Sequence, residues 1–315
     1  MKTRKMMILG FSLLVVSFFA FYACQKDTST SDVSNAVLVS ESTTAQDDAG
    51  VTEISNNVTD QLDNTVSTLD ANGYNSSLLK SAELGSQCMM VQVDHPDSTV
   101  FPKVITITFE SCSDSIGAAK TGTIVVTLSD RFWKLHSSRM IRFENFSVNG
   151  FKIQGYKSVE NMGFVNGYLN WNVVDSFKVV FPNDTTTITR YSERTRILQT
   201  AKLYDENSLT SMSEFARWWK LNWWHAMYKV TETGTGTNRY GDALELSTVS
   251  PLYMRMGCKH ILAGDLLLVN TTRDRRTEMN WGTDPNVSCG MNILTVTVTD
   301  SVKHMTMKHL GHWEW

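Results

Sequence analysis

The sequence lacks the local patterns of several common enzyme classes. In its 315 residues, no serine lies in a Gly-x-Ser-x-Gly elbow, and no glycine-rich loop opens a helix to hold a phosphate group. Its five cysteines contain no Cys-x-x-Cys pair, which disfavours a zinc site. We therefore predict no catalytic residue, no metal ligand and no cofactor. The paired carboxylates of a glycosidase can be far apart in a sequence, so a secreted hydrolase that acts on glycans remains the alternative.

Proline and clustered basic residues are also scarce. The chain contains 5 prolines, and its 29 Lys and Arg residues are outnumbered by 32 Asp and Glu, which gives a formal net charge of −3. A net-acidic chain without a basic cluster is not expected to bind nucleic acid.

The first residues have the pattern of a secretory signal. Three basic residues precede a mostly apolar run over residues 6–23, and Cys24 follows a small residue. This order predicts a signal peptide over residues 1–23 and not a structural helix. A transmembrane anchor is the alternative, because an apolar run of this length can just span a bilayer. Loss of the leader would lower the formal net charge from −3 to −6.

The residues around the end of this leader resemble a bacterial lipoprotein signal. Cys24 takes the place of the lipidated cysteine, and residues 25–27 (Gln-Lys-Asp) resemble the start of the export tag of Bacteroidota lipoproteins. The resemblance implies a palmitate-bearing anchor in the outer membrane, with display at the cell surface. Residues 24–48 are rich in Ser, Thr, Asp, Asn and Ala, and this composition predicts a lipid anchor and a flexible stalk.

A helical pattern follows the expected stalk, in a lead-in over residues 49–85. Apolar residues recur there at steps of three and four, and Asn72-Gly73 is a good helix stop. We predict a short helix that lays one apolar stripe on the main domain. A helical partner site or coiled coil is the alternative reading of the same residues. The apolar positions are Val51, Ile54, Val58, Leu62, Val66 and Leu69.

From residue 86 onward the apolar residues alternate with polar ones, as in half-buried strands. Short turns separate these runs, which favours antiparallel neighbours. We predict an all-β domain over residues 86–315, an antiparallel meander that forms a curled sheet or a sandwich. The expected strands after residue 139 are 140–146, 151–160, 168–174, 177–181, 185–196, 226–233, 243–248, 261–269, 276–281 and 293–298.

Four cysteines remain for disulfides once Cys24 carries lipid, and an exported protein meets an oxidising compartment. Two similarly ordered units, each a cysteine, a strand, a cysteine and a strand, suggest a weak internal repeat. This repeat favours Cys88 with Cys112 and Cys258 with Cys289 among the three pairings that four cysteines allow. Two buried pairs of free thiols are the alternative.

Several blocks of this domain resemble a family of Bacteroidota lipoproteins of uncharacterised activity. The resemblance covers about residues 50–300 and rests on three blocks. It implies a β-rich lipoprotein and carries no catalytic residue. The blocks are Thr106–Phe109 before Cys112 with Gly122–Thr127, Phe143–Phe146 with Val148–Gly150, and Gly234–Arg239 with Gly257–Lys259 and the strand at Cys289.

One segment of the β-domain is rich in tryptophan and has helical spacing. Ser211 and Glu214 have capping-box spacing, and an aromatic arc that includes Trp218, Trp219 and Trp223 follows. A small helical insertion that caps the sheet is one reading. The alternatives are a platform for sugar rings, a partner-binding ridge and insertion into a membrane surface. These three tryptophans are our candidate binding residues.

A charged strand gives a further expectation. Arg190, Arg194 and Arg196 alternate along one predicted strand, and we read them with Glu193 as a solvent-exposed ladder of ion pairs. Overall, the sequence predicts a non-catalytic binding or envelope-interaction module. Its expected partners are the membrane, through the lipid, and a glycan or another envelope protein.

Overall fold

A computed structural model gives the fold of most of the chain. It describes residues 29–75, 89–97, 99–113, 118–183, 185–199, 219, 226–258, 260–289, 294–299 and 304–309. The chain divides into two compact units, residues 1–41 and residues 42–315. The contacts reported below lie within the second unit.

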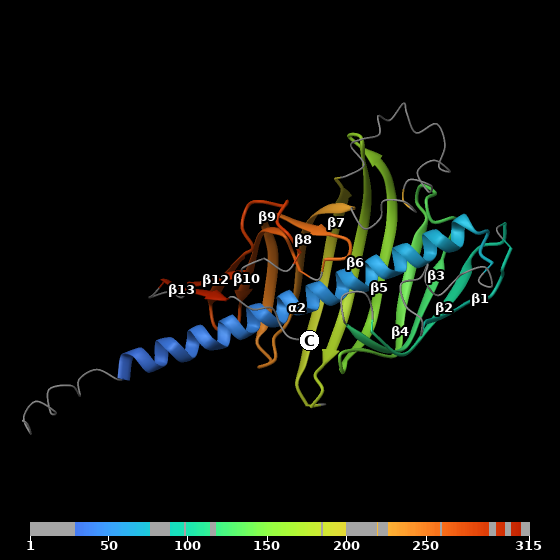
Figure 1. The fold of residues 1–315 in the computed structure, drawn as a ribbon. Helices are drawn as coiled ribbons and strands as arrows, with labels where there is room; N and C mark the ends of the chain where they lie inside the picture. Colours follow the sequence, from blue (N-terminus) through green and yellow to red (C-terminus); the bar gives the residue numbers. More distant parts are fainter. Residues whose placement is uncertain are drawn as a thin grey trace, which may run out of the picture. The chain divides into compact units, whose positions relative to one another are not determined.

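The second unit is built on one antiparallel sheet (Figure 1). Thirteen strands among the described residues follow one another in chain order, each paired with the next, so the sheet is a simple meander. The predicted all-β class is confirmed. Of the two predicted arrangements, a curled sheet or a sandwich, the described residues form a single sheet. The strands are β1 Met89–Val93, β2 Lys103–Ser113, β3 Ala119–Leu128, β4 Ser138–Val148, β5 Phe151–Val165, β6 Tyr168–Val180, β7 Thr187–Leu198, β8 Met227–Thr237, β9 Ala243–Arg255, β10 Ala263–Asn270, β11 Arg275–Asn280, β12 Leu294–Thr299 and β13 His304–His309.

The strands have one buried face and one exposed face. In β7 every second residue from Ile188 to Leu198 is buried, and the residues between them are exposed or half-buried. Side chains of a strand point alternately to its two faces, so this alternation defines a buried inner face and an outer face. Figure 1 shows the sheet curving around the part of the helix from Ser42 onward, which lies on the inner side.

Helix α2 spans Ser29–Ala71. The predicted stalk over residues 24–48 is therefore wrong from Ser29 onward, because the polar residues there continue the helix. All six residues of the predicted apolar stripe are buried. The helix ends at the expected stop, where Gly73 has a φ of 64° and the Tyr74 amide donates to the Leu69 carbonyl at 2.7 Å.

The polar side of the helix is buried as well as the apolar stripe. Glu53, Asp63, Asn64 and Ser67 are each at most 7% exposed, although their spacing places them on the side of the helix opposite the apolar stripe. Because the curved sheet contacts this part of the helix on its polar side too, the helix forms a polar centre for the unit. The prediction of a helix that contacts the domain through one apolar stripe therefore missed the contacts of its polar side.

A disulfide joins the connection after β9 to the connection between β11 and β12. Cys258 and Cys289 are bonded, with their Cα atoms 5.2 Å apart, as the repeat predicted. Cys88 lies outside the described residues, so its pairing with Cys112 of β2 stays a prediction. Within the described part of the chain, no helix is both long enough and apolar enough to cross a membrane.

Candidate functional site

The pairing of β8 and β9 is interrupted in the middle of the sheet. Val230 pairs with Leu252 and Thr233 pairs with Ser247, so β9 uses more residues than β8 to cover the same distance. The side chain of Thr248 replaces the missing backbone contacts. Its Oγ1 accepts a hydrogen bond from the Glu232 amide at 2.8 Å and donates one to the Glu232 carbonyl at 3.2 Å. Bulges of this kind bend strands and re-aim side chains, often beside functional sites.

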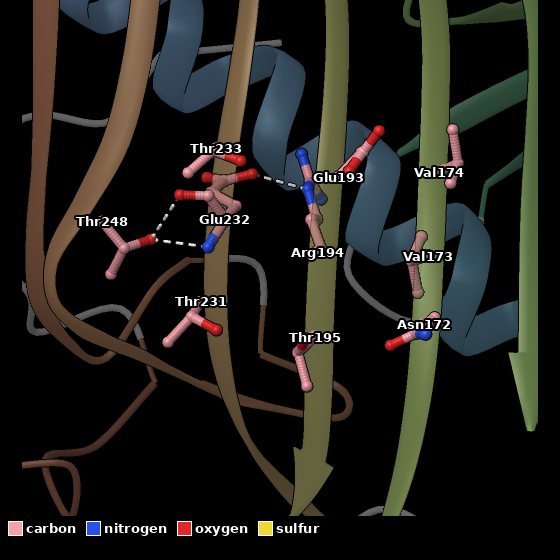
Figure 2. Close-up of a pocket in the computed structure, with 10 residues that line it drawn as sticks. All are labelled: Asn172, Val173, Val174, Glu193, Arg194, Thr195, Thr231, Glu232, Thr233 and Thr248. Carbon is pink, nitrogen blue, oxygen red and sulfur yellow. Dashed lines mark hydrogen bonds and ion pairs between the residues drawn. The ribbon is translucent and has the colours of Figure 1, made fainter. Parts of the chain in front are cut away.

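A groove of about 420 Å³ lies at this interruption (Figure 2). Residues of β6, β7, β8 and β9 line it: Asn172, Val173, Val174, Glu193, Arg194, Thr195, Thr231, Glu232, Thr233 and Thr248. Their order follows from strand register, because residues paired across neighbouring strands share a face. One row on the outer face is Asn172, Thr195 and Thr231, and the next is Val174, Glu193 and Thr233. The outer lining is thus mainly hydroxyl and amide groups.

Two half-exposed tyrosines stand in the row beyond Glu193. Tyr156 and Tyr191 both pair with Ser176 of β6, from opposite sides, so the three residues form one row on the outer face. The tyrosines are 38% and 41% exposed. The Tyr191 hydroxyl donates to Oε1 of Glu193 at 2.8 Å, which connects the aromatic row to the groove.

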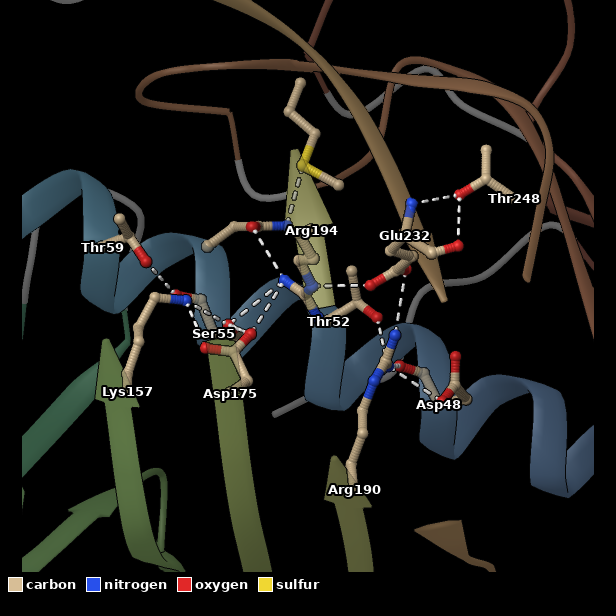
Figure 3. Close-up of polar contacts among 12 residues, drawn as sticks. Asp48, Thr52, Ser55, Thr59, Lys157, Asp175, Arg190, Arg194, Glu232 and Thr248 are labelled. Atoms are coloured by element: carbon tan, nitrogen blue, oxygen red, sulfur yellow. Dashed lines mark hydrogen bonds and ion pairs between the residues drawn. The ribbon is translucent and has the colours of Figure 1, made fainter. Parts of the chain in front are cut away.

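The groove lies over a buried network of charged side chains. Arg194 and Glu232 come from the same strands as the outer lining but face inward, and Arg194 Nε lies 2.6 Å from Glu232 Oε2. Figure 3 shows that this pair belongs to a larger set, which joins the helix to β5, β6, β7 and β8.

One end of this network is centred on Asp175 of β6. Its Oδ1 lies 2.8 Å from Lys157 Nζ, and its Oδ2 lies 3.4 Å from Arg194 NH1. The hydroxyl of Ser55 on the helix donates to Asp175 at 3.0 Å and accepts from Lys157 at 2.8 Å. All four side chains are buried, so the carboxylate has partners in place of water.

The other end is centred on Arg190 of β7. Its guanidinium lies 2.9 Å from Asp48 Oδ1 and 3.0 Å from Glu232 Oε1, and it donates to the Thr52 hydroxyl at 2.6 Å. Asp48 and Thr52 are one helical turn apart, so they present a matched pair of acceptors on one side of the helix.

A third group extends the network toward β4. Arg196 of β7 is paired with Asp60 and lies 3.4 Å from Asp63 Oδ2. Arg139 of β4 lies 3.0 Å from the other oxygen of Asp63. In these three groups the sheet therefore supplies every cation, and the helix supplies most of the carboxylates.

The charges of these three groups balance. The five cations, Arg139, Lys157, Arg190, Arg194 and Arg196, face the five carboxylates Asp48, Asp60, Asp63, Asp175 and Glu232. Buried charges persist only when they are paired and hydrogen-bonded. This balance explains how a polar helix can occupy the interior.

Burial and pairing shift the pKa values of these groups in different directions. Burial favours the neutral acid, but Lys157 and Arg194 outweigh it and hold the pKa of Asp175 below its usual value. Arg190 and Arg194 do the same for the pKa of Glu232. Burial dominates at Asp60 and Lys157, where it raises the pKa of Asp60 to about 6 and lowers that of Lys157 to about 8.

The predicted exposed ladder on β7 is wrong. Arg190, Arg194 and Arg196 are each at most 5% exposed, and Glu193 lies on the opposite face. Strand periodicity already implied this split, because three even-numbered positions and one odd-numbered position cannot share a face. The acidic partners were the missing information, since Asp48, Asp60 and Asp63 are far away in the sequence.

The candidate tryptophans are only partly described. Trp219 is 1% exposed, and its ring packs edge-on against Trp133 with centroids 5.3 Å apart. This burial contradicts an exposed platform at Trp219 and agrees with the capping alternative. Trp218 and Trp223 lie outside the described residues.

The predicted anchor residue, Cys24, also lies outside the described residues. Over the described ranges, no group of three or more His, Cys, Asp or Glu side chains is arranged to hold a metal ion. The outer groove was missed by the sequence reading, because its residues come from four strands and depend on the interruption at Thr248.

Comparisons with known proteins add no relative. No family model, no curated protein and no solved structure matches the chain. The resemblance to Bacteroidota lipoproteins therefore stays a prediction from the sequence.

Proposed function

We propose that this chain is an outer-membrane lipoprotein, anchored through Cys24 and displayed at the cell surface, whose folded part is a non-catalytic binding module. The anchor is supported by the order of basic residues, apolar run and cysteine at the start of the sequence. The binding role is supported by one observation above all: a groove lined mainly by hydroxyl and amide groups on the outer face of β6 to β9.

The carboxylates of the groove favour binding over hydrolysis. A glycosidase needs two carboxyl groups on either side of a bond, one of which carries a proton. Two carboxylates line the groove, but they lie on opposite faces of the sheet. Glu193 is on the outer face, whereas Glu232 faces inward and is paired with two arginines. Those arginines hold the pKa of Glu232 below its usual value, so it is a poor proton donor.

The anchor is tested with Cys24→Ser in intact cells. We expect the wild-type chain to incorporate labelled fatty acid and to fractionate with the outer membrane, and the variant to lose both properties. Protease treatment of intact cells then tests surface display. Fatty-acid labelling of the Cys24→Ser chain would refute the anchor, and full protection from protease would refute display.

The binding role is tested with the full-length lipoprotein in detergent. We expect it to retain envelope material in a pull-down and to leave polysaccharide chains uncut. Release of new reducing ends from a polysaccharide would favour the hydrolase instead.

A further inference from the structure

We propose that the outer groove at Thr248, together with Tyr156 and Tyr191, is a binding site for a neutral oligosaccharide chain. This inference rests on the proposed function and deepens it, because it names the class of ligand. The site is formed by the outer face of β5 to β9.

The lining matches the chemistry of a sugar chain. Sugar hydroxyls both donate and accept hydrogen bonds, and Asn172, Thr195, Thr231 and Thr233 offer groups that do the same. Of the two valines in the lining, Val174 belongs to the outer face, where the C–H face of a ring can pack against it.

The tyrosine row adds an aromatic surface at the end of the groove. Tyr156 and Tyr191 are separated by one intervening strand, so their Cα atoms are about 10 Å apart from the usual strand spacing. Both rings are half-exposed, and the Tyr191 hydroxyl donates a hydrogen bond to Glu193. Rigid, half-exposed aromatic rings beside hydrogen-bonding groups are typical binding anchors.

The groove does not suit an anionic ligand. Arg194 is the one cation among the ten lining residues, and its guanidinium is turned inward to Glu232 and Asp175. Glu193, on the outer face, would repel a phosphate or a carboxylate. A neutral chain therefore fits better than a phosphorylated or acidic one.

The groove does not suit an extended peptide either. Peptides commonly bind a sheet by adding a strand at a free edge, through backbone hydrogen bonds. Strands β6, β7 and β8 are each paired on both sides, so their backbone groups are already used. A ligand on this face must be held by side chains, which favours hydroxyl-rich chains over peptide backbones.

The test is affinity electrophoresis of the full-length lipoprotein in detergent, through native gels that contain dextran, mannan or xylan. Polygalacturonate serves as an acidic polymer, and a casein digest added to a polymer-free gel serves as a peptide probe. We expect at least one neutral polymer to retard the wild-type protein, with Tyr191→Ala and Asn172→Ala each weakening the apparent affinity at least tenfold.

Tyr240→Ala is the matched control, because Tyr240 is 50% exposed in the turn after β8 and lies outside the groove. It should bind as the wild type does. Thr231→Val preserves the shape of the side chain and removes its hydroxyl, so it gives a second test should another variant fail to fold.

Three results would overturn the proposal: no retardation by any neutral polymer, equal retardation of wild-type and groove variants, or a response only to polygalacturonate or peptide. These results are separable from failure of the proposed function. Fatty-acid labelling at Cys24 and retention of envelope material would still support a lipoprotein binding module with a different site.

Discussion

The two faces of strands β6, β7 and β8 use opposite chemistries. The inner face carries Asp175, Arg194 and Glu232, which form ion pairs with one another, and Asp175 and Arg194 also contact Ser55 of the helix. The outer face carries mostly neutral hydroxyl and amide groups at the alternate positions, such as Thr195 and Thr231. The inner face holds the structure together, and the outer face is free to meet a ligand.

The difference shows how one set of strands can serve two roles. Charges on the inner face form ion pairs within the sheet and between the sheet and the helix, so they are balanced within the chain. The side chains of the outer groove are uncharged apart from Glu193, so their contacts with water can be traded for contacts with a ligand at little cost. Substitutions on the two faces should therefore differ sharply in their effects.

The largest effect is expected from Glu232→Gln on the inner face. The substitution keeps the shape of the side chain but leaves Arg190 and Arg194 facing a neutral amide. Breaking a buried ion pair from one side typically costs about 3 to 5 kcal/mol, because the remaining charge is left uncompensated. Chemical denaturation should therefore show a free energy of unfolding lower by about that amount. A loss below about 1 kcal/mol would mean that water or rearrangement replaces the carboxylate.

The next effect is a dependence of stability on pH. Burial raises the pKa of Asp60 to about 6 in the folded chain. An acid whose folded pKa is raised stabilises the fold most below its unfolded pKa, near 4, and loses that contribution as the pH rises through 6. We expect the free energy of unfolding to fall by about 1 to 3 kcal/mol between pH 4 and pH 7.

Asp60→Asn provides the control for this pH effect, because asparagine keeps the polar contact with Arg196 and does not titrate. Its unfolding free energy should fall less over the same range. The lowered pKa values of Asp175 and Glu232 act below pH 4, where their contribution is lost as the pH falls, so they lie outside this window. Identical pH profiles for the variant and the wild type would contradict a raised pKa at Asp60.

Sequence patterns predicted the elements better than their partners. Alternation located most strands, and the repeat identified Cys258 with Cys289, because both signals are local or depend on chain order. The stripe from Val51 to Leu69 also predicted the helix core. The polar residues of the helix were misread, since a polar face is normally solvated unless another element supplies charges.

The candidate site was beyond the reach of local patterns. Thr248 belongs to a run that reads as an ordinary strand, and only the register between β8 and β9 reveals the interruption. Tyr156 and Tyr191 are separated by 35 positions in the sequence. They lie in one row on the outer face because both pair with Ser176 of β6, which lies between their strands. Trp219 had the stronger signal in the sequence, yet its ring is buried against Trp133.

A smaller effect on stability is expected from Thr248→Val. Thr248 lines the outer groove and contacts the backbone of Glu232, whose side chain faces inward. Valine keeps the branched shape but removes the hydroxyl that contacts both backbone groups of Glu232. A lost hydrogen bond at a buried amide costs about 1 to 3 kcal/mol, and the partial exposure of this site places the expected value near 1 kcal/mol. Thr248→Ser retains the hydroxyl and should remain within about 0.5 kcal/mol of the wild type. Equal stability of all three chains in urea would show that the bridge adds nothing.

The smallest effect is expected from Glu193→Gln, the same chemical change as Glu232→Gln on the opposite face. Glu193 is exposed and accepts a hydrogen bond from the hydroxyl of Tyr191. The side-chain oxygen of a glutamine can accept the same hydrogen bond. Surface substitutions away from special features usually change stability by less than about 0.5 kcal/mol. Denaturation of the two variants side by side therefore measures the difference between the faces with one substitution type. If Glu193→Gln destabilised the chain as much as Glu232→Gln, the outer face would be part of the folding core, and its assignment to ligand binding would lose its basis.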